Sequence, residues 1–285
     1  MRSRIPEFDR QAESFDARAG LGPEAGAEIA RAIMQLAGHG PDDLVLEIGA
    51  GTGELGQHLA RQAARYLGLD LSRPLLSVFS SKLLAVPLAV ADCEQPWPLP
   101  DGSVRAIVAS RVAHRLRPEP VTGEAMRVLR PGGMLLIGQI QRDPASLMEQ
   151  LRAERRRIAS GGRGGGQERR REARSLIESL VAAGASELSP SVAARWERRR
   201  SPREIISGWE GLERGSGAGE RRGGTGGRSG RRRQEFVELD DEQRTSVLRA
   251  LRAWAEAAFG DLDRPVTIAE WYELRGVVLP GQQRA

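Results

Sequence analysis

The segment that most constrains the fold is residues 44–54, where a short apolar run meets three closely spaced glycines. Its first five residues have the length and composition of a strand that is buried on both faces, as in a parallel sheet. Gly49, Gly51 and Gly53 then allow a tight turn whose backbone can approach a ligand closely. We expect a helix to follow over residues 53–64. This strand, turn and helix predict a doubly wound α/β fold with its ligand at the carboxyl end of the first strand.

Strand and helix patterns alternate through the first 140 residues. Further strands are expected at 66–69, 86–91, 104–110 and 134–140. Helices are expected at 23–37, 73–84 and 119–129. Strands that alternate with helices predict a parallel sheet with helices on both faces.

The pattern is looser in the second half of the chain. Helices are expected at 144–158, at 175–183, from Ser201 onward and at 239–259, and strands at 188–196 and 268–279. Ser201, Pro202 and Glu204 form a helix-start signature with capping-box spacing. Stretches rich in arginine and glycine at 159–170 and 214–233 predict mobile loops. We therefore expect residues 1–142 to form the core, and 143–285 to supply a substrate cap and the closing strands of the same fold.

The composition limits the classes of protein that this chain can be. Residues 1–150 carry 16 basic and 18 acidic side chains, a balance of −2, and residues 151–285 carry 27 and 20, a balance of +7. Lys82 is the single lysine, so the arginine excess indicates a compositional bias rather than selection for phosphate binding. One cysteine and three histidines predict neither a disulfide framework nor a metal site. Without an apolar run of about 18 residues or a secretory signal, we expect a cytoplasmic protein with no membrane span.

Acidic residues around the glycine turn bear on the kind of cofactor. Asp70 ends the next predicted strand, 21 residues after Gly49, about the separation at which a carboxylate takes ribose hydroxyls. Glu54 stands where the dinucleotide fingerprint needs glycine, and Glu47 adds a second negative charge. These charges disfavour a pyrophosphate and hence a nicotinamide-dependent reductase. They are compatible with S-adenosyl-L-methionine, which has no phosphate.

Four blocks occur in order: LEIGAGTGE, GLDLS, ADCEQPWPLPDGSVRAIVAS and EAMRVLRPGGMLLI. In this order they resemble class I S-adenosylmethionine-dependent methyltransferases, especially the ubiquinone/menaquinone-biosynthesis-like (methyltransferase type 11) group. The stretch FDRQAESFDARAGL is similar to the opening segment of that group and of the malonyl-carrier-protein methyltransferase of biotin synthesis. The resemblance implies a Rossmann-like sheet of seven strands, the last antiparallel, and methyl transfer to a small-molecule acceptor.

The resemblance also implies roles for individual residues. Glu47 and the glycines would surround the methionine part of the cofactor, Asp70 would hold the ribose, and Asp92 would accept from the adenine amino group. The family has two histidines three residues apart after the fourth strand, where this chain has Arg111 and His114. His114 is therefore the candidate general base. The implied cofactor-binding residues are Glu47, Gly49, Ala50, Gly51, Gly53, Asp70, Leu71, Asp92, Cys93 and Arg111.

Other interpretations stay open at this point. Asp70 could cap a helix, Asp92 could stabilise a turn, and Cys93 could be a small buried residue without chemistry. The basic second half is compatible with an RNA- or protein-directed methyltransferase, although no RNA-binding module is recognisable and nucleic acid is the less favoured partner. Arg111 and the glycine-rich insertions are compatible with a methyltransferase fold that has lost activity. The oligomeric state is not predicted.

Overall fold

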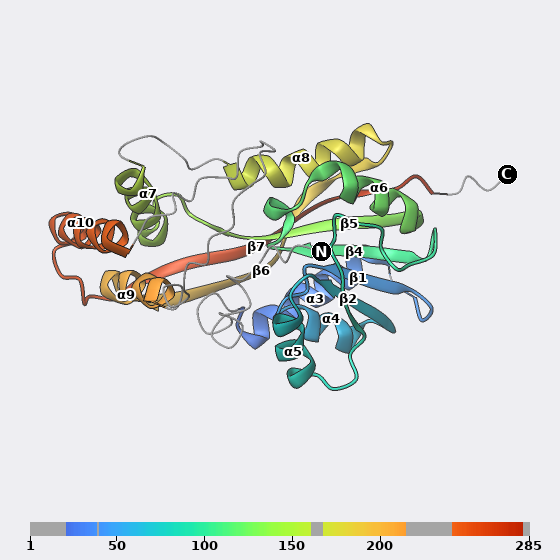
Figure 1. Cartoon of the computed structure of the whole chain (residues 1–285), viewed down its shortest axis with the longest axis horizontal. Coiled ribbons are helices and arrows are strands. Elements are labelled where there is room, and N and C mark those ends of the chain that lie inside the picture. The colour runs from blue at the N-terminus through green and yellow to red at the C-terminus, as the bar shows by residue number, and fades with distance from the viewer. Residues whose placement is uncertain (1–20, 39, 161–167, 215–240, 282–285) are drawn as a thin grey trace, which may run out of the picture. The chain divides into compact units, whose positions relative to one another are not determined.

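The computed structural model describes residues 21–38, 40–160, 168–214 and 241–281 (Figure 1). The chain divides into two compact units. Unit 1 comprises residues 1–141, 167–196 and 270–285, and unit 2 comprises 142–166 and 197–269. The described residues contain no helix long and apolar enough to cross a membrane.

A seven-stranded sheet has the strand order β3-β2-β1-β4-β5-β7-β6. Its strands are β1 Leu44–Ile48, β2 Arg65–Asp70, β3 Leu88–Val90, β4 Val104–Ser110, β5 Leu129–Arg142, β6 Ser186–Arg200 and β7 Val266–Val278. Parallel pairs join β3 to β2, β2 to β1, β1 to β4 and β4 to β5. The order changes direction at β1, so the carboxyl ends of β1 and β4 flank the switch point of the sheet.

Strand β7 runs antiparallel to β5. Tyr272 lies against Gly138. Just after β7, the Leu279 N–H donates to the Gly133 carbonyl at 2.8 Å. The residue numbers rise along one strand as they fall along the other, which confirms the predicted mixed sheet with an antiparallel last strand.

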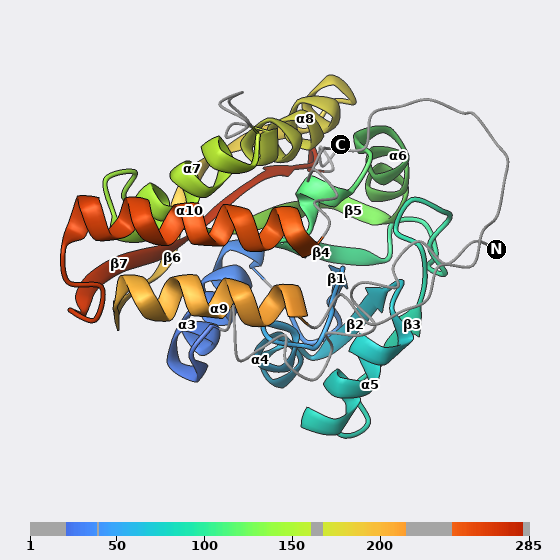
Figure 2. The same cartoon turned by 60° about the vertical axis from the view of Figure 1, so that its left-hand side comes forward.

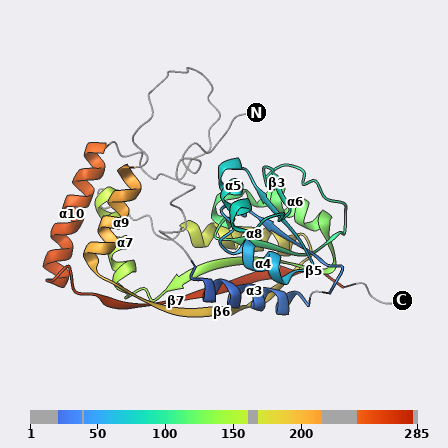
Figure 3. The ribbon, with the colours of Figure 1, turned by 90° about the horizontal axis from the view of Figure 1, so that it is seen from below.

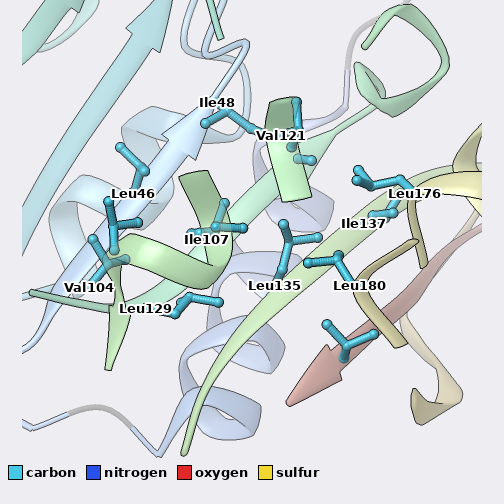
Figure 4. Close-up of a cluster of buried hydrophobic side chains, with 14 of the residues drawn as sticks. Leu46, Ile48, Val104, Ile107, Val121, Leu129, Leu135, Ile137, Leu176 and Leu180 are labelled. Carbon is cyan, nitrogen blue, oxygen red and sulfur yellow. The ribbon is translucent and has the colours of Figure 1, made fainter. Parts of the chain in front are cut away.

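Helices cover both faces of the unit 1 sheet (Figure 1). One face carries α3 Pro23–Ala37, α4 Gly56–Gln62 and α5 Arg73–Lys82, and the other carries α6 Pro118–Val128 and α8 Glu168–Ala182. Figure 4 shows the apolar cluster under α6 and α8, where Val121 and Leu176 pack with strand residues such as Ile107. Successive residues of β5 alternate between the faces, with Leu135 in this cluster and Leu136 in the opposite one. A strand with two buried faces must be apolar throughout, and that is the pattern the sequence shows.

Unit 2 has its own apolar core, which three helices share: α7 Leu147–Ala159, α9 Pro202–Arg214 and α10 Asp241–Phe259 (Figures 2 and 3). Leu151, Ile206 and Leu251 are fully or almost fully buried in it. The predicted capping box at the start of α9 is present. Glu204 N–H donates to Ser201 Oγ at 3.2 Å, and the Ser201 N–H donates back to the Glu204 carboxylate at 2.9 Å.

Several predicted boundaries were wrong. The helix predicted from Gly53 begins at Gly56, because Gly53 has φ 74° and cannot join a right-handed helix. Strand β3 has three residues instead of six. Helix α8 begins at Glu168, inside the loop predicted over 159–170. The predicted loop at 214–233 lies outside the described residues except for Arg214, which ends α9.

Candidate cofactor site

The loop after β1 contains three glycines in the left-handed region, with φ 69° at Gly49, 55° at Gly51 and 74° at Gly53. Two of them are required by packing inside the protein. A Cβ on Gly49 would lie 2.5 Å from Val112 Cγ2, and one on Gly53 would lie 2.1 Å from Phe79 Cδ2. Gly51 differs, because the nearest atom to its Cβ would be 4.0 Å away. The backbone at Gly51 is therefore the part of the loop that another molecule can approach.

The loop is anchored to the neighbouring strand and helix. The Ala50 N–H donates to the Leu69 carbonyl of β2 at 2.9 Å. Lys82, in the last turn of α5, donates from Nζ to the Thr52 carbonyl at 2.8 Å. Sequence reasoning missed this role of the single lysine, because nothing local relates positions 52 and 82.

Asp70 ends β2 beside the loop, and its side chain is buried. Its Oδ2 accepts from the Gly51 N–H and its Oδ1 from the Ser72 N–H, each at 2.8 Å. A carboxylate oxygen can accept more than one hydrogen bond. Helix α5 is capped by Ser72, whose Oγ accepts from the Leu75 N–H at 3.3 Å, so Asp70 is not the helix cap.

Glu47 is completely buried and points toward β2, where the Tyr66 hydroxyl donates to its Oε2 at 2.5 Å. Burial raises the pKa of Glu47 to about 8, although the hydrogen bond from Tyr66 opposes the shift. The shift favours the protonated form of Glu47. The edge of the Tyr66 ring meets the Phe79 ring at a centroid distance of 6.1 Å.

Glu54 pairs with Arg111, which follows β4, and it also accepts from the Leu21 N–H. Arg111 balances the charge of Glu54, and the raised pKa of Glu47 favours its neutral form. The two acidic residues therefore make the loop less anionic than the sequence predicts, and their charge does not by itself exclude a pyrophosphate. The sequence could not show this, because Arg111 lies far along the chain from Glu54.

Asp92 and Cys93 follow β3 on the other side of the loop. The Asp92 carboxylate accepts from the Glu94 N–H at 2.9 Å, which stabilises a turn, as one interpretation of the sequence held. Cys93 is buried, and burial raises the pKa of its thiol to about 12 despite a hydrogen bond from the Gly49 N–H. The sulfur therefore stays a neutral thiol near the loop.

A second polar contact lies at the carboxyl end of β4. The Ser110 hydroxyl and the Tyr272 hydroxyl are 2.6 Å apart, and Tyr272 is fully buried. Burial raises the pKa of Tyr272 to about 12. His114, the candidate base, is half-buried in the 3-10 turn Ala113–Arg115 that follows. Within the described residues, no group of three or more His, Cys, Asp or Glu is arranged to hold a metal ion.

Comparison with known proteins agrees with this geometry. Residues 46–137, which include the glycine loop, Asp70 and Asp92, match the family model described as a methyltransferase domain. This part of the chain is a methyltransferase domain. The match confirms the class I methyltransferase family that the sequence predicts.

Two relatives illustrate the range of the family. The chain is 33% identical over 135 residues to a malonyl-[acyl-carrier protein] O-methyltransferase of Yersinia pestis, covering 47% of this chain and 48% of that protein. It is 36% identical over 141 residues to the 23S rRNA (guanine(748)-N(1))-methyltransferase of Streptomyces fradiae, covering 47% of each. The chain thus spans about half the length of these two relatives.

Solved structures match over more of the chain. A proposed type II methyltransferase from Anaeromyxobacter dehalogenans has a TM-score of 0.53 at 18% identity, covering 88% of this chain and 97% of that one. A proposed methyltransferase from Bacillus halodurans has a TM-score of 0.52 at 16% identity, covering 88% and 98%. At these identities the likeness supports the fold.

Proposed function

We propose that the protein is a methyltransferase that binds S-adenosylmethionine at the glycine loop and Asp70. The observation that carries the proposal is the hydrogen bond from the Gly51 N–H to the Asp70 carboxylate, at a glycine whose Cβ would have no described atom closer than 4.0 Å. This joins the two features that the sequence associated with a nucleoside cofactor. The match of residues 46–137 to the methyltransferase domain supports the same conclusion.

The residues present suit this cofactor. A side chain at position 51 would fill the open space above the loop, so a glycine there leaves room for a ligand. The carboxylate of Asp70 is held in one orientation by two backbone N–H groups, and a carboxylate is the acceptor that ribose hydroxyls require. When bound, S-adenosylmethionine supplies a methyl group that its sulfonium has already activated.

The predicted cofactor residues surround the three parts of the cofactor in this proposal. The loop backbone and Glu47 surround the methionine part, Asp70 binds the ribose, and Leu71 and Asp92 bind the adenine with Cys93 beside them. Asp92 can do so while it caps its turn, because the hydrogen bond from the Glu94 N–H goes to one of its two carboxylate oxygens. The full set is Glu47, Gly49, Ala50, Gly51, Gly53, Asp70, Leu71, Asp92, Cys93 and Arg111.

The main contribution of the chain is to position an acceptor atom in line with the methyl group, at about 3–3.5 Å. We propose a small molecule as the acceptor, recognised by residues of unit 2. A general base is needed only where the acceptor atom must lose a proton, and His114 is our candidate.

RNA is the alternative acceptor. Two observations favour it: the balance of +7 over residues 151–285, and the similarity to an enzyme named for a guanine of 23S rRNA. Retention on RNA that falls steeply with rising salt would support this alternative. Absence of retention on RNA at low salt would favour the small molecule.

Calorimetric titration with S-adenosylmethionine, S-adenosylhomocysteine and NADH tests the cofactor. We expect binding of the first two at micromolar concentrations. Gly51→Arg should abolish it by filling the open space, whereas Gly123→Arg should not, because Gly123 is exposed on α6 with nothing near its Cβ. Thermal melts of both variants check folding. Binding of NADH alone, or undiminished binding by Gly51→Arg, would refute the proposal.

A further inference from the structure

Arg111 has an unusual backbone. Its φ is 55°, and Ala85 is the other non-glycine residue with positive φ in the described part of the chain. This conformation is costly for a residue with a side chain, and such strain is typical of functional sites. A glycine would relieve it, so the presence of arginine indicates that the side chain is needed.

The neighbouring strands hold this backbone in place. The Arg111 N–H donates to the Gly138 carbonyl of β5 at 2.8 Å. Ser110, one residue earlier, contacts the Tyr272 hydroxyl of β7 at 2.6 Å. The Tyr272 hydroxyl fits there because Gly138 has no side chain, since a Cβ would lie 2.0 Å from it. The start of the Arg111 side chain is therefore fixed by two strands.

The far end of the side chain lies at the loop after β1. Its guanidinium pairs with Glu54, one residue past Gly53. The Arg111 side chain is 24% exposed, whereas that of Glu54 is 9% exposed. The positive charge of Arg111 also lowers the pKa values of Glu47 and Tyr272 to a small extent, which agrees with a position close to both. A partly exposed guanidinium thus lies at the end of the loop assigned to the methionine part of the cofactor.

We propose that Arg111 binds the carboxylate of the methionine moiety of S-adenosylmethionine, with Glu54 keeping the guanidinium oriented. The inference rests on the proposed function, which supplies the ligand. A guanidinium has five N–H donors and matches the two oxygens of a carboxylate, so it can hold Glu54 and a second carboxylate together. The competing explanation is that Arg111 only neutralises the buried Glu54.

Two ligands separate these explanations: S-adenosylmethionine and decarboxylated S-adenosylmethionine, which keeps the nucleoside and sulfonium but lacks the carboxylate. Calorimetry is done on the wild type, on Glu54→Gln and on Glu54→Gln combined with Arg111→Gln. The first substitution removes the charge that Arg111 would otherwise leave unpaired, so the second tests the guanidinium alone. Arg61→Gln is the matched control, because Arg61 is exposed on α4 and bonds to Gln57.

We expect Glu54→Gln to retain a preference for S-adenosylmethionine. Adding Arg111→Gln should weaken S-adenosylmethionine binding by about ten- to a hundredfold, the range of a charge-assisted hydrogen bond. Binding of the decarboxylated ligand should change less than about threefold, because this ligand has no carboxylate for Arg111 to bind. Should the double variant fail to fold, Arg111→Lys distinguishes the two explanations, because lysine keeps the charge but lacks the planar fork. This variant should weaken the binding of S-adenosylmethionine but not that of the decarboxylated ligand.

Equal losses for both ligands would overturn the inference and assign Arg111 a structural role. Unchanged affinities would overturn it as well. Both results leave the proposed function standing, because the wild type still binds the cofactor. A wild type that binds neither ligand would refute the proposed function itself, and the inference with it.

Discussion

Asp70 shows how a single carboxylate can be prepared for a ligand by its own backbone. Two N–H groups, from Gly51 and Ser72, fix its orientation at 2.8 Å each. Its side chain therefore loses little rotational freedom when a ribose binds. This lowers the entropic cost that an ordered side chain adds to an interaction.

Asp70→Ala should weaken S-adenosylmethionine binding by about ten- to a hundredfold, the effect of losing hydrogen bonds to a charged group. Asp42→Ala, at an exposed position before β1, is the control. Calorimetry measures both. A loss below about threefold in Asp70→Ala would show that the carboxylate is not at the ribose.

Glu47 makes stability depend on pH. Burial raises its pKa to about 8 from an unfolded value of 4.5, so between these values the unfolded chain releases a proton that the folded chain keeps. Rising pH therefore favours unfolding, by at most about 1.4 kcal/mol per pH unit from this group. The effect is absent below about pH 4.5 and complete above about pH 8.

Urea denaturation at several pH values between 5 and 8 checks this prediction. The unfolding free energy of the wild type minus that of Glu47→Gln should decrease as the pH rises. The reason is that Glu47 titrates in the wild type, whereas glutamine does not titrate in the variant. The comparison also cancels His58, whose lowered pKa acts in the opposite direction in both proteins. A difference independent of pH would mean that Glu47 is ionised in the folded state.

At the scale of helices and strands, the sequence predicts what is local. The apolar run of β1 meets the glycines within a few residues, and the caps of α5 and α9 lie within three residues of their partners. The exact start of α4 was not predictable from Gly53, because a glycine can lie either in a turn or in the first turn of a helix. The pairs Glu47–Tyr66, Glu54–Arg111 and Ser110–Tyr272 join residues from different elements, and no local pattern relates them. They decide the electrostatics of the site, and only the folded sheet brings them together.

The contact between β5 and β7 predicts the effect of one methyl group. Gly138→Ala should destabilise unit 1 by about 1–3 kcal/mol, because its Cβ would lie 2.0 Å from the Tyr272 hydroxyl and the packed strands must shift. Gly208→Ala is the control, since nothing lies near its Cβ on α9. Denaturant midpoints of both variants and the wild type provide the measurement. A Gly138→Ala midpoint equal to that of the wild type would contradict the close approach of the two strands.

For the whole molecule, the interleaved units have separate cores. Unit 1 has apolar clusters on both faces of its sheet, and unit 2 has a third cluster among α7, α9 and α10. The proposed division of labour assigns the cofactor to unit 1 and acceptor recognition to unit 2. Damage to the core of unit 2 should therefore leave cofactor affinity intact.

Leu251→Ala removes a fully buried side chain from unit 2 and should destabilise that unit by about 2–5 kcal/mol. Hydrogen exchange should rise in α7, α9 and α10, with S-adenosylmethionine affinity within about twofold of wild type, because no proposed cofactor residue lies in unit 2. Leu136→Ala, in the sheet of unit 1, is the matched variant, and it should lower both the stability of unit 1 and the affinity for S-adenosylmethionine. Loss of affinity in Leu251→Ala would contradict the separation of roles.

The position of β7 has a consequence for the order in which the chain is made. Ser110 and Tyr272, which meet at the end of β4, are 162 residues apart in the chain. Until a ribosome has synthesised unit 2 and then β7, the outer edge of β5 has no strand beside it. That edge carries Leu135 and Ile137 and resembles the unpaired edges through which incomplete chains associate with one another. Closing so distant a contact is also slow, so the nascent protein is vulnerable to aggregation until β7 pairs with β5.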